Sequence, residues 1–361
     1  MKILFITRAT LYKGTGGDTI QVLRTADYLK RLSIGVDIRL TDEVINYTEY
    51  DLIHFFNIIR PADILRHIAS SGKPYVISTI FVDYSEFERK ARKGFAKWVF
   101  GSLSDDQADY LKVIARFLLN GEKIVSPSYL LYGQRRSIKK IIRGSGMLLP
   151  NSASEYRRLY QRYGVEHSYT VIPNGIDPLL FDGAAAREGR VDDLVICVGR
   201  IEGIKNQLNL IRALNGTRYR LIIIGAHSPN QKGYYEKCRQ EAAANISFID
   251  ATNQQGLISY YTSARVHVLP SWFETTGLSS LEAAAMGCNI VITDKGDTRE
   301  YFGDQAYYCD PGSPESILAA VDRAATADVD EALRKKIFSD YTWAKAAEKT
   351  ADAYRKVLHY A

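Results

Sequence analysis

The 361-residue sequence has few cysteines: there are only four, and they lie far apart, at positions 197, 238, 288 and 309. This spacing provides neither the close pairs of a structural zinc site nor the dense pattern of a small domain held by disulfides. Three of the four lie in or beside apolar segments with the character of strands, which is typical of buried free thiols. We therefore expect a protein of a reducing compartment, the cytoplasm.

Long apolar runs are missing as well. No segment approaches the ~20 consecutive apolar residues of a membrane span, and Met1–Ile6 enters a strand directly, without the pattern of a signal peptide. Hydrophobic residues make up 46% and charged residues 24% of the chain, an ordinary globular composition. The net charge of +6 is a mild surplus that suits an anionic ligand or an anionic membrane surface, and it gives no sign of a nucleic-acid partner.

Motifs for metal or nucleophilic catalysis are also lacking. The sequence contains no Asp-x-Asp motif in a setting that suits a metal, no cluster of His and Cys ligands, and no convincing Ser-His-Asp arrangement. We therefore expect no metal and no bound cofactor.

The sequence does contain a repeated alternation of strand and helix. Apolar, strand-like segments are followed by amphipathic helical patterns in two series, which predicts an α/β fold with doubly wound parallel sheets. At 361 residues the chain is long enough for two domains with separate cores. We place the first domain at 1–175 and the second at 176–340, with a linker at 183–193. The predicted strands are residues 2–7, 36–40, 51–56, 75–80 and 146–152 in the first series, and 194–198, 221–224, 246–249, 266–269 and 289–293 in the second.

The stretch 270–294 carries the most specific chemistry. After strand 266–269 a loop holds Glu274, and Gly277 permits a tight turn into a helix that bears Glu282. Unpaired N–H groups around Gly277 and Leu278, with the positive end of the helix dipole, suit an anionic oxygen such as that of a diphosphate. Carboxylates instead suit hydroxyl donors, as on a sugar or a ribose. A nucleotide-sugar meets both demands, so this stretch predicts a nucleotide-sugar site.

Two cations follow strand 194–198, in a loop ahead of a predicted helix at 207–214. Arg200 offers a planar fork and Lys205 a point charge, and together they can neutralise a leaving diphosphate without a metal. Basic residues in loops are usually only solvated, but a place at the end of a strand, combined with the 270–294 stretch, favours a functional interpretation.

These residues resemble a known family. Glu274 and Glu282 are separated by seven residues, Gly277 and Leu278 stand between them, and Glu-Ala-Ala-Ala-Met-Gly occupies 282–287. This pattern resembles the carboxylate pair of retaining glycosyltransferases of the GT-B fold, in particular glycosyltransferase family 4 (glycosyl transferases group 1). Thr276 departs from that family, which commonly has an aromatic or other apolar residue there. Further matches are the cation pair Arg200 and Lys205, the segment Asn174–Asp177 and the glycine pair Gly16 and Gly17.

The resemblance implies two Rossmann-like domains facing a cleft, with 1–175 binding the acceptor, 176–340 binding the donor, and a helix at 341–361 crossing back to pack on the first domain. It also implies retaining, metal-independent transfer of a sugar from a nucleotide-diphosphate sugar to a glycan or lipid-linked acceptor, in bacterial cell-surface polysaccharide synthesis. The catalytic residues it implies are Arg200 and Lys205, which would stabilise the leaving diphosphate, and Glu274, which would hold hydroxyls of the donor sugar. The donor-binding residues it implies are Gly16, Gly17, Asn174, Gly277, Leu278 and Glu282, the last on the ribose.

The first domain offers candidates for the acceptor side. His54 lies in the third strand and Asp83 follows the fourth, near the carboxyl ends where open α/β sheets bind ligands. A lone His in an apolar strand is more often a core residue, so His54 has two interpretations. Basic and aromatic residues interleave over 86–101, which predicts peripheral contact with the inner face of the membrane or, alternatively, a solvated charged helix face. The basic residues of 135–143 would extend this region.

Two other functions stay open. Residues 14–19, Gly-Thr-Gly-Gly-Asp-Thr, nearly form a dinucleotide-binding fingerprint, with Asp37 or Asp42 as the ribose acid, which would indicate an NAD-dependent oxidoreductase. The loop is long for that motif, and Thr19 replaces its last small residue. The other alternative is a non-catalytic GT-B sugar-binding subunit, against which the complete set of two cations and two carboxylates argues.

Overall fold

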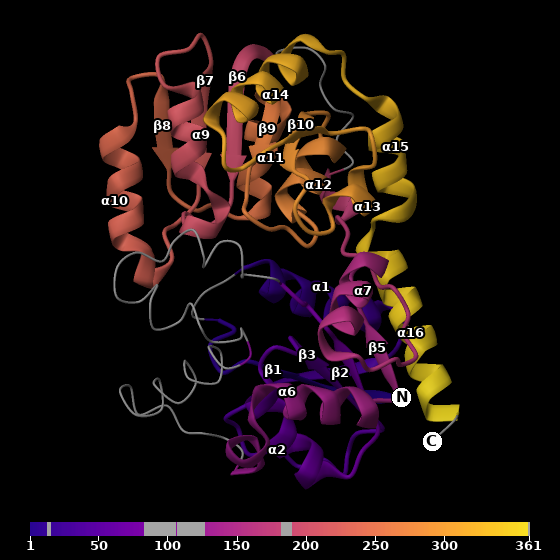
Figure 1. Cartoon of the computed structure of the whole chain (residues 1–361). Helices are drawn as coiled ribbons and strands as arrows, with labels where there is room; N and C mark the ends of the chain where they lie inside the picture. The colour runs from indigo at the N-terminus through magenta and orange to yellow at the C-terminus, as the bar shows by residue number, and fades with distance from the viewer. Residues whose placement is uncertain (13–15, 83–105, 107–126, 182–189, 360–361) are drawn as a thin grey trace. The chain divides into compact units, whose positions relative to one another are not determined.

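The computed structural model describes residues 1–12, 16–82, 106, 127–181 and 190–359 (Figure 1). The chain divides into two compact units, one made of Met1–Pro173 with Ala346–Ala361 and the other of Asn174–Lys345. Parts of four predictions made from the sequence lie outside the described residues: Asp83, the stretch 86–101, residues 14–15 of the fingerprint 14–19, and residues 183–189 of the linker.

The first unit contains a five-stranded sheet in the order β2-β1-β3-β4-β5, and all of its strand pairs are parallel. The strands β1, β3 and β4 are buried almost throughout because helices cover a parallel sheet on both faces, whereas the edge strand β2 is only partly buried. The described elements are β1 (Lys2–Thr7), α1 (Gly17–Arg31), β2 (Gly35–Leu40), β3 (Leu52–Phe56), α2 (Pro61–Ser71), β4 (Tyr75–Ser78), α6 (Pro127–Gly144), β5 (Met147–Leu149) and α7 (Ala153–Tyr163).

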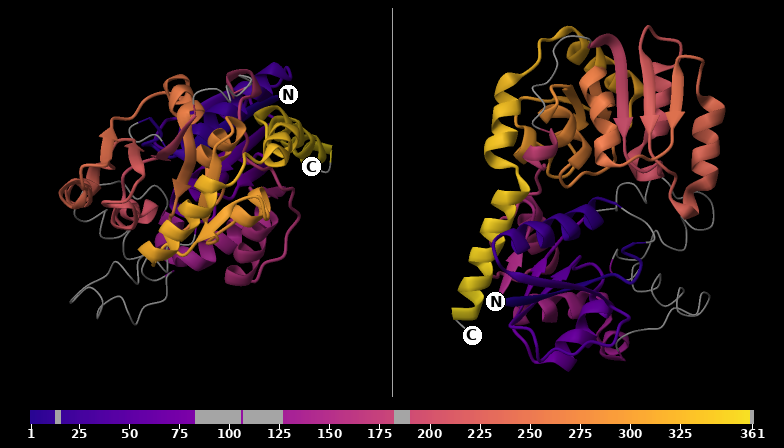
Figure 2. Two further views of the ribbon diagram at one scale, coloured as in Figure 1. Left: turned by 90° about the horizontal axis from the view of Figure 1, so that it is seen from above. Right: turned by 180° about the vertical axis from the view of Figure 1, so that it is seen from behind.

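The second unit contains a six-stranded parallel sheet in the order β11-β10-β9-β6-β7-β8, and Figure 2 shows this unit from behind. The order places β10, β9 and β6 side by side at the middle of the sheet. Its elements are α8 (Pro178–Phe181), β6 (Val191–Val198), the 3-10 turn η1 (Gly203–Lys205), α9 (Gln207–Leu214), β7 (Arg220–Ile224), the 3-10 turn η2 (Pro229–Gln231), α10 (Lys232–Glu241), β8 (Ile246–Ile249), α11 (Gln254–Ser263), β9 (Ala264–Leu269), α12 (Leu278–Ala285), β10 (Asn289–Thr293), α13 (Thr298–Phe302), β11 (Tyr307–Cys309), α14 (Pro314–Thr326) and α15 (Glu331–Asp340).

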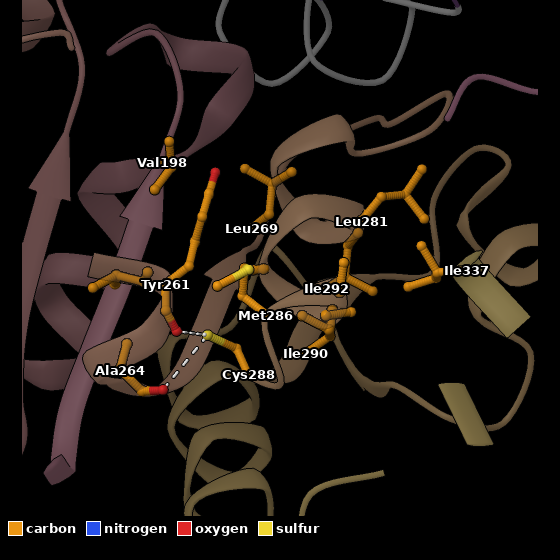
Figure 3. Close-up of a cluster of buried hydrophobic side chains, with 14 of the residues drawn as sticks. Val198, Tyr261, Ala264, Leu269, Leu281, Met286, Cys288, Ile290, Ile292 and Ile337 are labelled. Atoms are coloured by element: carbon orange, nitrogen blue, oxygen red, sulfur yellow. Dashed lines mark hydrogen bonds between the residues drawn. The ribbon is translucent and has the colours of Figure 1, made fainter. Parts of the chain in front are cut away.

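Alternate residues of the central strand β6 enter different cores. Ile196 and Val198 belong to the cluster drawn in Figure 3, with Leu281, Met286 and Ile290 around them. Val195 and Cys197 belong to a separate cluster on the other face. This division follows from the period of two in a strand, and it makes the second unit a three-layer structure. All four cysteines are free and buried, as expected; Cys288 donates to two backbone carbonyl groups in Figure 3.

The chain connects the two units through two adjacent segments. Ile176 N–H donates to Tyr341 O at 2.8 Å, and Trp343 N–H donates to Ile176 O at 3.0 Å. Helix α16 (Trp343–His359) then belongs to the first unit from Ala346 onward. The observed division therefore falls at 173/174 and 345/346. The sequence analysis places it at 175/176 and 340/341. The second boundary lies later than predicted because Tyr341 and Trp343 pair with Ile176 of the second unit.

One boundary in the sequence analysis is wrong. Residues 191–193 were expected in a linker at 183–193, but β6 begins at Val191. Asp192 and Asp193 made this end look like a loop. The side chain of Asp193 forms an ion pair with Arg220 of β7, with Nη2 and Oδ1 3.0 Å apart, so the strand is extended by a cross-strand contact between charged residues.

Candidate active site

The candidate residues of the second unit gather at one edge of its sheet. Arg200 and Lys205 follow β6, Glu274 follows β9, and the 294–297 loop follows β10. These three strands are neighbours and parallel, so their carboxyl ends meet at the same edge. Ligands of open α/β sheets bind at such edges.

Backbone hydrogen bonds hold the loops after β6 and β9 together. Trp272 N–H donates to Ile204 O at 2.8 Å. Asn206, which ends the 3-10 turn with φ at 60°, donates through its side-chain amide to the carbonyl oxygens of Pro270 at 3.0 Å and Pro311 at 2.7 Å. Asparagine tolerates this left-handed conformation better than most residues. The sequence analysis missed Asn206 because this residue is uncharged, whereas its neighbour Lys205 was recognised by its charge.

Lys205 and Glu274 contact each other directly. The Lys205 ammonium donates to Glu274 Oε1, and the Ser271 hydroxyl donates to the same oxygen at 2.6 Å. The side chains of Lys205 and Glu274 are 23% and 7% exposed, so this ion pair is largely shielded from water. Of the three predicted catalytic residues, the structure therefore brings two into contact. Ser271 was not predicted, and its only sequence signal is its place three residues before Glu274.

Arg200 lies on the same loop but has a different partner. Its guanidinium pairs with Glu202 of its own loop, with Nη2 and Oε1 3.0 Å apart, and its side chain is 45% exposed. Glu202 is 14% exposed, so the ion pair is partly exposed, and a pair near the surface contributes about 1 kcal/mol or less. A diphosphate could therefore replace Glu202 at little cost.

The helix N-terminus expected at Gly277 is present. Gly277 is the N-cap of α12 with φ at 71°, a conformation that favours glycine. The Ser279 hydroxyl donates to Val198 O at 2.9 Å, which fixes the first turn of α12 beside the end of β6. Leu278 is the first residue of the helix, so its N–H group has no acceptor inside the helix and points outward from the N-terminus.

Glu282 is held from helix α11. Gln254 Nε2 donates to Glu282 Oε1 at 2.6 Å, and the Tyr261 hydroxyl donates to Oε2 at 2.9 Å. Burial, reinforced by the Glu282 carboxylate, raises the pKa of Tyr261 well above its ordinary value, so this hydroxyl remains a proton donor. Gln254 and Tyr261 were not predicted because they lie more than 20 residues from Glu282 in the sequence.

The loops after β9 and β10 pair through their backbones. Glu274 N–H donates to Lys295 O at 3.1 Å, and Asp297 N–H donates to Glu274 O at 2.8 Å. Between them, Gly296 has φ at 100°, and a Cβ atom added there would lie 2.1 Å from Glu274 O. Only glycine allows this approach, so Gly296 sets the backbone position of Glu274.

Asn174 reaches the same loop from the connecting segment. Its Nδ2 donates to Thr276 Oγ1 at 3.1 Å, and its N–H donates to the Tyr301 hydroxyl at 3.2 Å. Thr276 is buried, so the hydroxyl that departs from the family pattern serves the interior of the unit. Asn174 is thus connected to Glu274 through a residue two positions away.

In the first unit, Gly16 and Gly17 lie where α1 begins, after β1. Gly16 is the N-cap of α1, and Arg8 and Asp18 form an ion pair across the loop with Nε and Oδ2 2.7 Å apart. The Thr19 hydroxyl donates to Leu11 O at 3.2 Å. The long loop between β1 and α1 thus differs from the tight turn of a dinucleotide-binding fingerprint, in which a small residue stands at the place of Thr19.

His54 is a core residue, and the contacts give no support to its role at the acceptor site. Its Nδ1 bonds the Tyr354 hydroxyl of α16 at 2.6 Å, and its Nε2 bonds the Ser78 hydroxyl at 2.8 Å. Complete burial lowers the pKa of His54 to about 3. Since both ring nitrogens are engaged within the core and the side chain is buried, the core interpretation is the one that the structure favours.

Within the described residues, no three His, Cys, Asp or Glu side chains gather in a way that could hold a metal ion. None of the helices seen in this part of the chain has the length and apolar character needed to cross a membrane.

Comparison with known proteins identifies the second unit. Residues 186–338 match the family model described as glycosyl transferases group 1. An uncharacterized glycosyltransferase of Methanocaldococcus jannaschii is 28% identical over 212 residues, which cover 53% of this chain and 54% of that protein. This chain spans about half the length of the curated relatives it matches.

Solved structures share the architecture of the whole chain. Sucrose-phosphate synthase from Thermosynechococcus elongatus superposes with a TM-score of 0.77 at 15% identity, covering 100% of both chains. HepE of Anabaena in complex with UDP-glucose gives a TM-score of 0.69 at 15% identity, covering 98% of this chain and 99% of that one. Identity at this level speaks for the fold alone. The expected GT-B fold and the resemblance to group 1 are confirmed: residues 186–338 of the second unit match the glycosyl transferases group 1, and the chain has the GT-B fold.

Proposed function

We propose that the protein transfers a sugar from a nucleotide-diphosphate sugar to a glycan or lipid-linked acceptor, with retention at the anomeric carbon and without a metal. The observation that carries this proposal is the contact between Lys205 and Glu274 at the sheet edge where α12 begins. A cation for phosphate and a carboxylate for hydroxyls lie side by side there, and Glu282 is held four residues into the same helix. The structure of HepE with UDP-glucose supports a nucleotide-sugar as the donor.

The residues divide the reaction between them. Negative charge grows on the diphosphate as its bond to the sugar breaks, and Arg200, Lys205 and the N–H groups at the start of α12 stabilise it. Glu274 holds a hydroxyl of the sugar and Glu282 holds the ribose. The departing phosphate oxygen takes the proton of the acceptor hydroxyl, so no separate base is required of the protein. Bacterial cell-surface polysaccharide synthesis is the setting that we infer from the family resemblance.

A thermal-shift screen tests the donor site. The ligands are UDP, GDP, ADP, CMP, NAD and the corresponding nucleotide-sugars, and the variants are Arg200→Ala and Glu282→Ala. We expect one nucleoside diphosphate to raise the Tm, and each variant to abolish that rise. Arg220→Ala is the matched control, because Arg220 also forms an exposed ion pair but stands at the start of β7. Stabilisation by NAD alone would contradict the proposal and favour the oxidoreductase alternative. Stabilisation by no ligand would contradict the proposal without favouring that alternative.

We also propose contact with an anionic membrane surface. Besides the composition of 86–101, helix α6 supports it: α6 carries five basic residues and no acidic one, and Leu131 is 77% exposed. Lys140 Nζ lies 5.1 Å from the centre of the Tyr132 ring, so basic and aromatic groups share one surface. Such a surface attracts anionic lipid and inserts its apolar side chains.

Sedimentation with vesicles tests this contact. We expect binding to phosphatidylglycerol vesicles and not to phosphatidylcholine vesicles, with loss of binding in Arg136→Glu/Lys140→Glu. The control is Lys232→Glu/Lys237→Glu on α10, which makes the same change of charge on a different helix. Equal binding by the two double variants would contradict a specific role for α6.

A further inference from the structure

We propose that Ser271 is a positioning residue for Glu274: together with Lys205 it occupies Oε1, and this leaves Oε2 as the oxygen that accepts a hydroxyl of the donor sugar. The inference rests on the proposed function, and it assigns separate tasks to the two oxygens of one carboxylate.

The first observation is that Glu274 is fixed at its backbone. Its N–H and C=O both bond the 295–297 loop, and the absence of a Cβ at Gly296 permits this close approach. The carboxylate therefore starts from a fixed Cα, and only its side-chain torsions remain to be set. Contacts at the carboxylate set them.

The second observation is the distribution of donors around the carboxylate. Oε1 accepts from Lys205 Nζ and from Ser271 Oγ, which uses its two lone pairs. Among the described residues no donor reaches Oε2, and this oxygen is not among the buried polar atoms without a partner. Oε2 therefore keeps its full capacity to accept and is reachable from outside.

The third observation concerns Ser271 itself. It is completely buried, and its hydroxyl donates to Glu274 Oε1 at 2.6 Å. Hydrogen bonds to a carboxylate are stronger than those between neutral groups. When Lys205 turns toward a bound diphosphate, Ser271 is the donor that keeps Oε1 engaged. Without that hydroxyl, Oε1 loses its remaining donor and the carboxylate can rotate about its side-chain torsions, which would move Oε2 away from the sugar.

This division predicts that binding of the nucleotide and recognition of the sugar can be separated. Ser271→Ala removes nothing that contacts the nucleotide, so the Kd for UDP should stay within about twofold. The rate of UDP-glucose hydrolysis without acceptor should fall about 10-fold to 100-fold in kcat/KM, because a hydrogen bond to a charged group is lost from the transition state. Ser271→Cys, with a similar shape and a weaker donor, should fall between Ser271→Ala and the wild type.

Deoxy-sugar donors provide the readout that a purely structural role would not move. The substrates are a series of UDP-deoxyglucoses, each of which lacks one sugar hydroxyl. In the wild type, loss of the hydroxyl that donates a hydrogen bond to Glu274 should lower kcat/KM about 10-fold or more. In Ser271→Ala the same deoxygenation should cost less than about 3-fold, because Oε2 no longer holds that hydroxyl. Ser280→Ala is the matched control: this serine is also fully buried, and its hydroxyl bonds the core residue His267 at 3.3 Å.

The outcomes distinguish the two proposals. If the wild type binds none of the nucleoside diphosphates in the screen, the proposed donor fails and this inference fails with it; if one other than UDP raises the Tm, its sugar derivative replaces UDP-glucose in these assays. If the wild type binds and hydrolyses UDP-glucose, but Ser271→Ala keeps the full sensitivity to deoxygenation, the role of Ser271 is overturned while the donor site stands. A drop in UDP affinity equal to the drop in kcat/KM would also overturn it, because a general loss of structure explains both.

Discussion

Replacing Gly296 with alanine should displace Glu274 and test the geometry of the site without changing any side chain that carries a polar group. The added Cβ would lie 2.1 Å from Glu274 O, 2.9 Å from Glu274 C and 3.1 Å from Glu274 N. To reach an ordinary contact, the two segments have to separate by at least about 1 Å. All three neighbours are backbone atoms, so no side chain can turn aside to make room.

The cost has two parts. The φ angle of 100° costs an alanine about 1–2 kcal/mol. Separation of the segments weakens the two hydrogen bonds between Glu274 and the 295–297 loop, each worth about 1 kcal/mol. Together these lower the free energy of unfolding by about 3–4 kcal/mol, or about 6–15 °C in Tm for a unit of this size. A shift of ~1 Å at a positioning carboxylate should lower kcat/KM about 100-fold.

Differential scanning calorimetry and hydrolysis of UDP-glucose measure the two effects. The control is Gly216→Ala, which has φ at 66° but no atom within 4 Å of the added Cβ. It carries the conformational cost without the collision, so we expect a loss of about 1 kcal/mol and unchanged activity. If Gly296→Ala matches Gly216→Ala in both Tm and kcat/KM, the pairing of the two loops does not position Glu274.

Three further predictions concern single contacts. Asn206→Ala removes two hydrogen bonds to backbone carbonyl groups and places alanine at φ 60°, so the free energy of unfolding measured by urea titration should fall by about 2–4 kcal/mol. Asn206→Gly should recover only the part of this loss that comes from the φ angle. Equal losses of free energy in the two variants would contradict this account. Tyr261→Phe removes one donor to Glu282, and calorimetric titration should show about 3-fold to 10-fold weaker UDP binding; unchanged affinity would contradict a role for this bond. Burial lowers the pKa of both His54 and His267 to about 3, below the 6.5 of the unfolded chain. The unfolded chain therefore takes up protons first as the pH falls below 6.5, and stability should drop by about 1.4 kcal/mol per histidine and pH unit, with no such effect above that pH. His54→Gln should remove the contribution of one histidine, about 1.4 kcal/mol per pH unit, and an unaltered slope would assign it to other groups.

Most of the fold was predictable from the sequence because parallel strands covered on both faces are apolar without interruption. The predicted bounds of 246–249 and 289–293 coincide with β8 and β10. β11 (Tyr307–Cys309) was not predicted, because it is three residues long and only partly buried at the edge of the sheet. The start of β6 was misplaced for a related reason: charged residues at a strand end resemble a loop until their cross-strand partner is known.

The sequence by itself determined which groups could bind a nucleotide-sugar, since Arg200, Lys205 and Glu274 each follow an apolar strand and Gly277 precedes a helix. Only the tertiary structure decided which of these groups meet. Lys205 and Glu274 are 69 residues apart in sequence, and their contact depends on β6 and β9 being neighbours. Strand order follows from how helices pack across the sheet, and the alternation of apolar segments does not encode it. The roles of Ser271 and Asn206 and the place of His54 in the core likewise depend on contacts that only the tertiary structure fixes, so the sequence did not predict them.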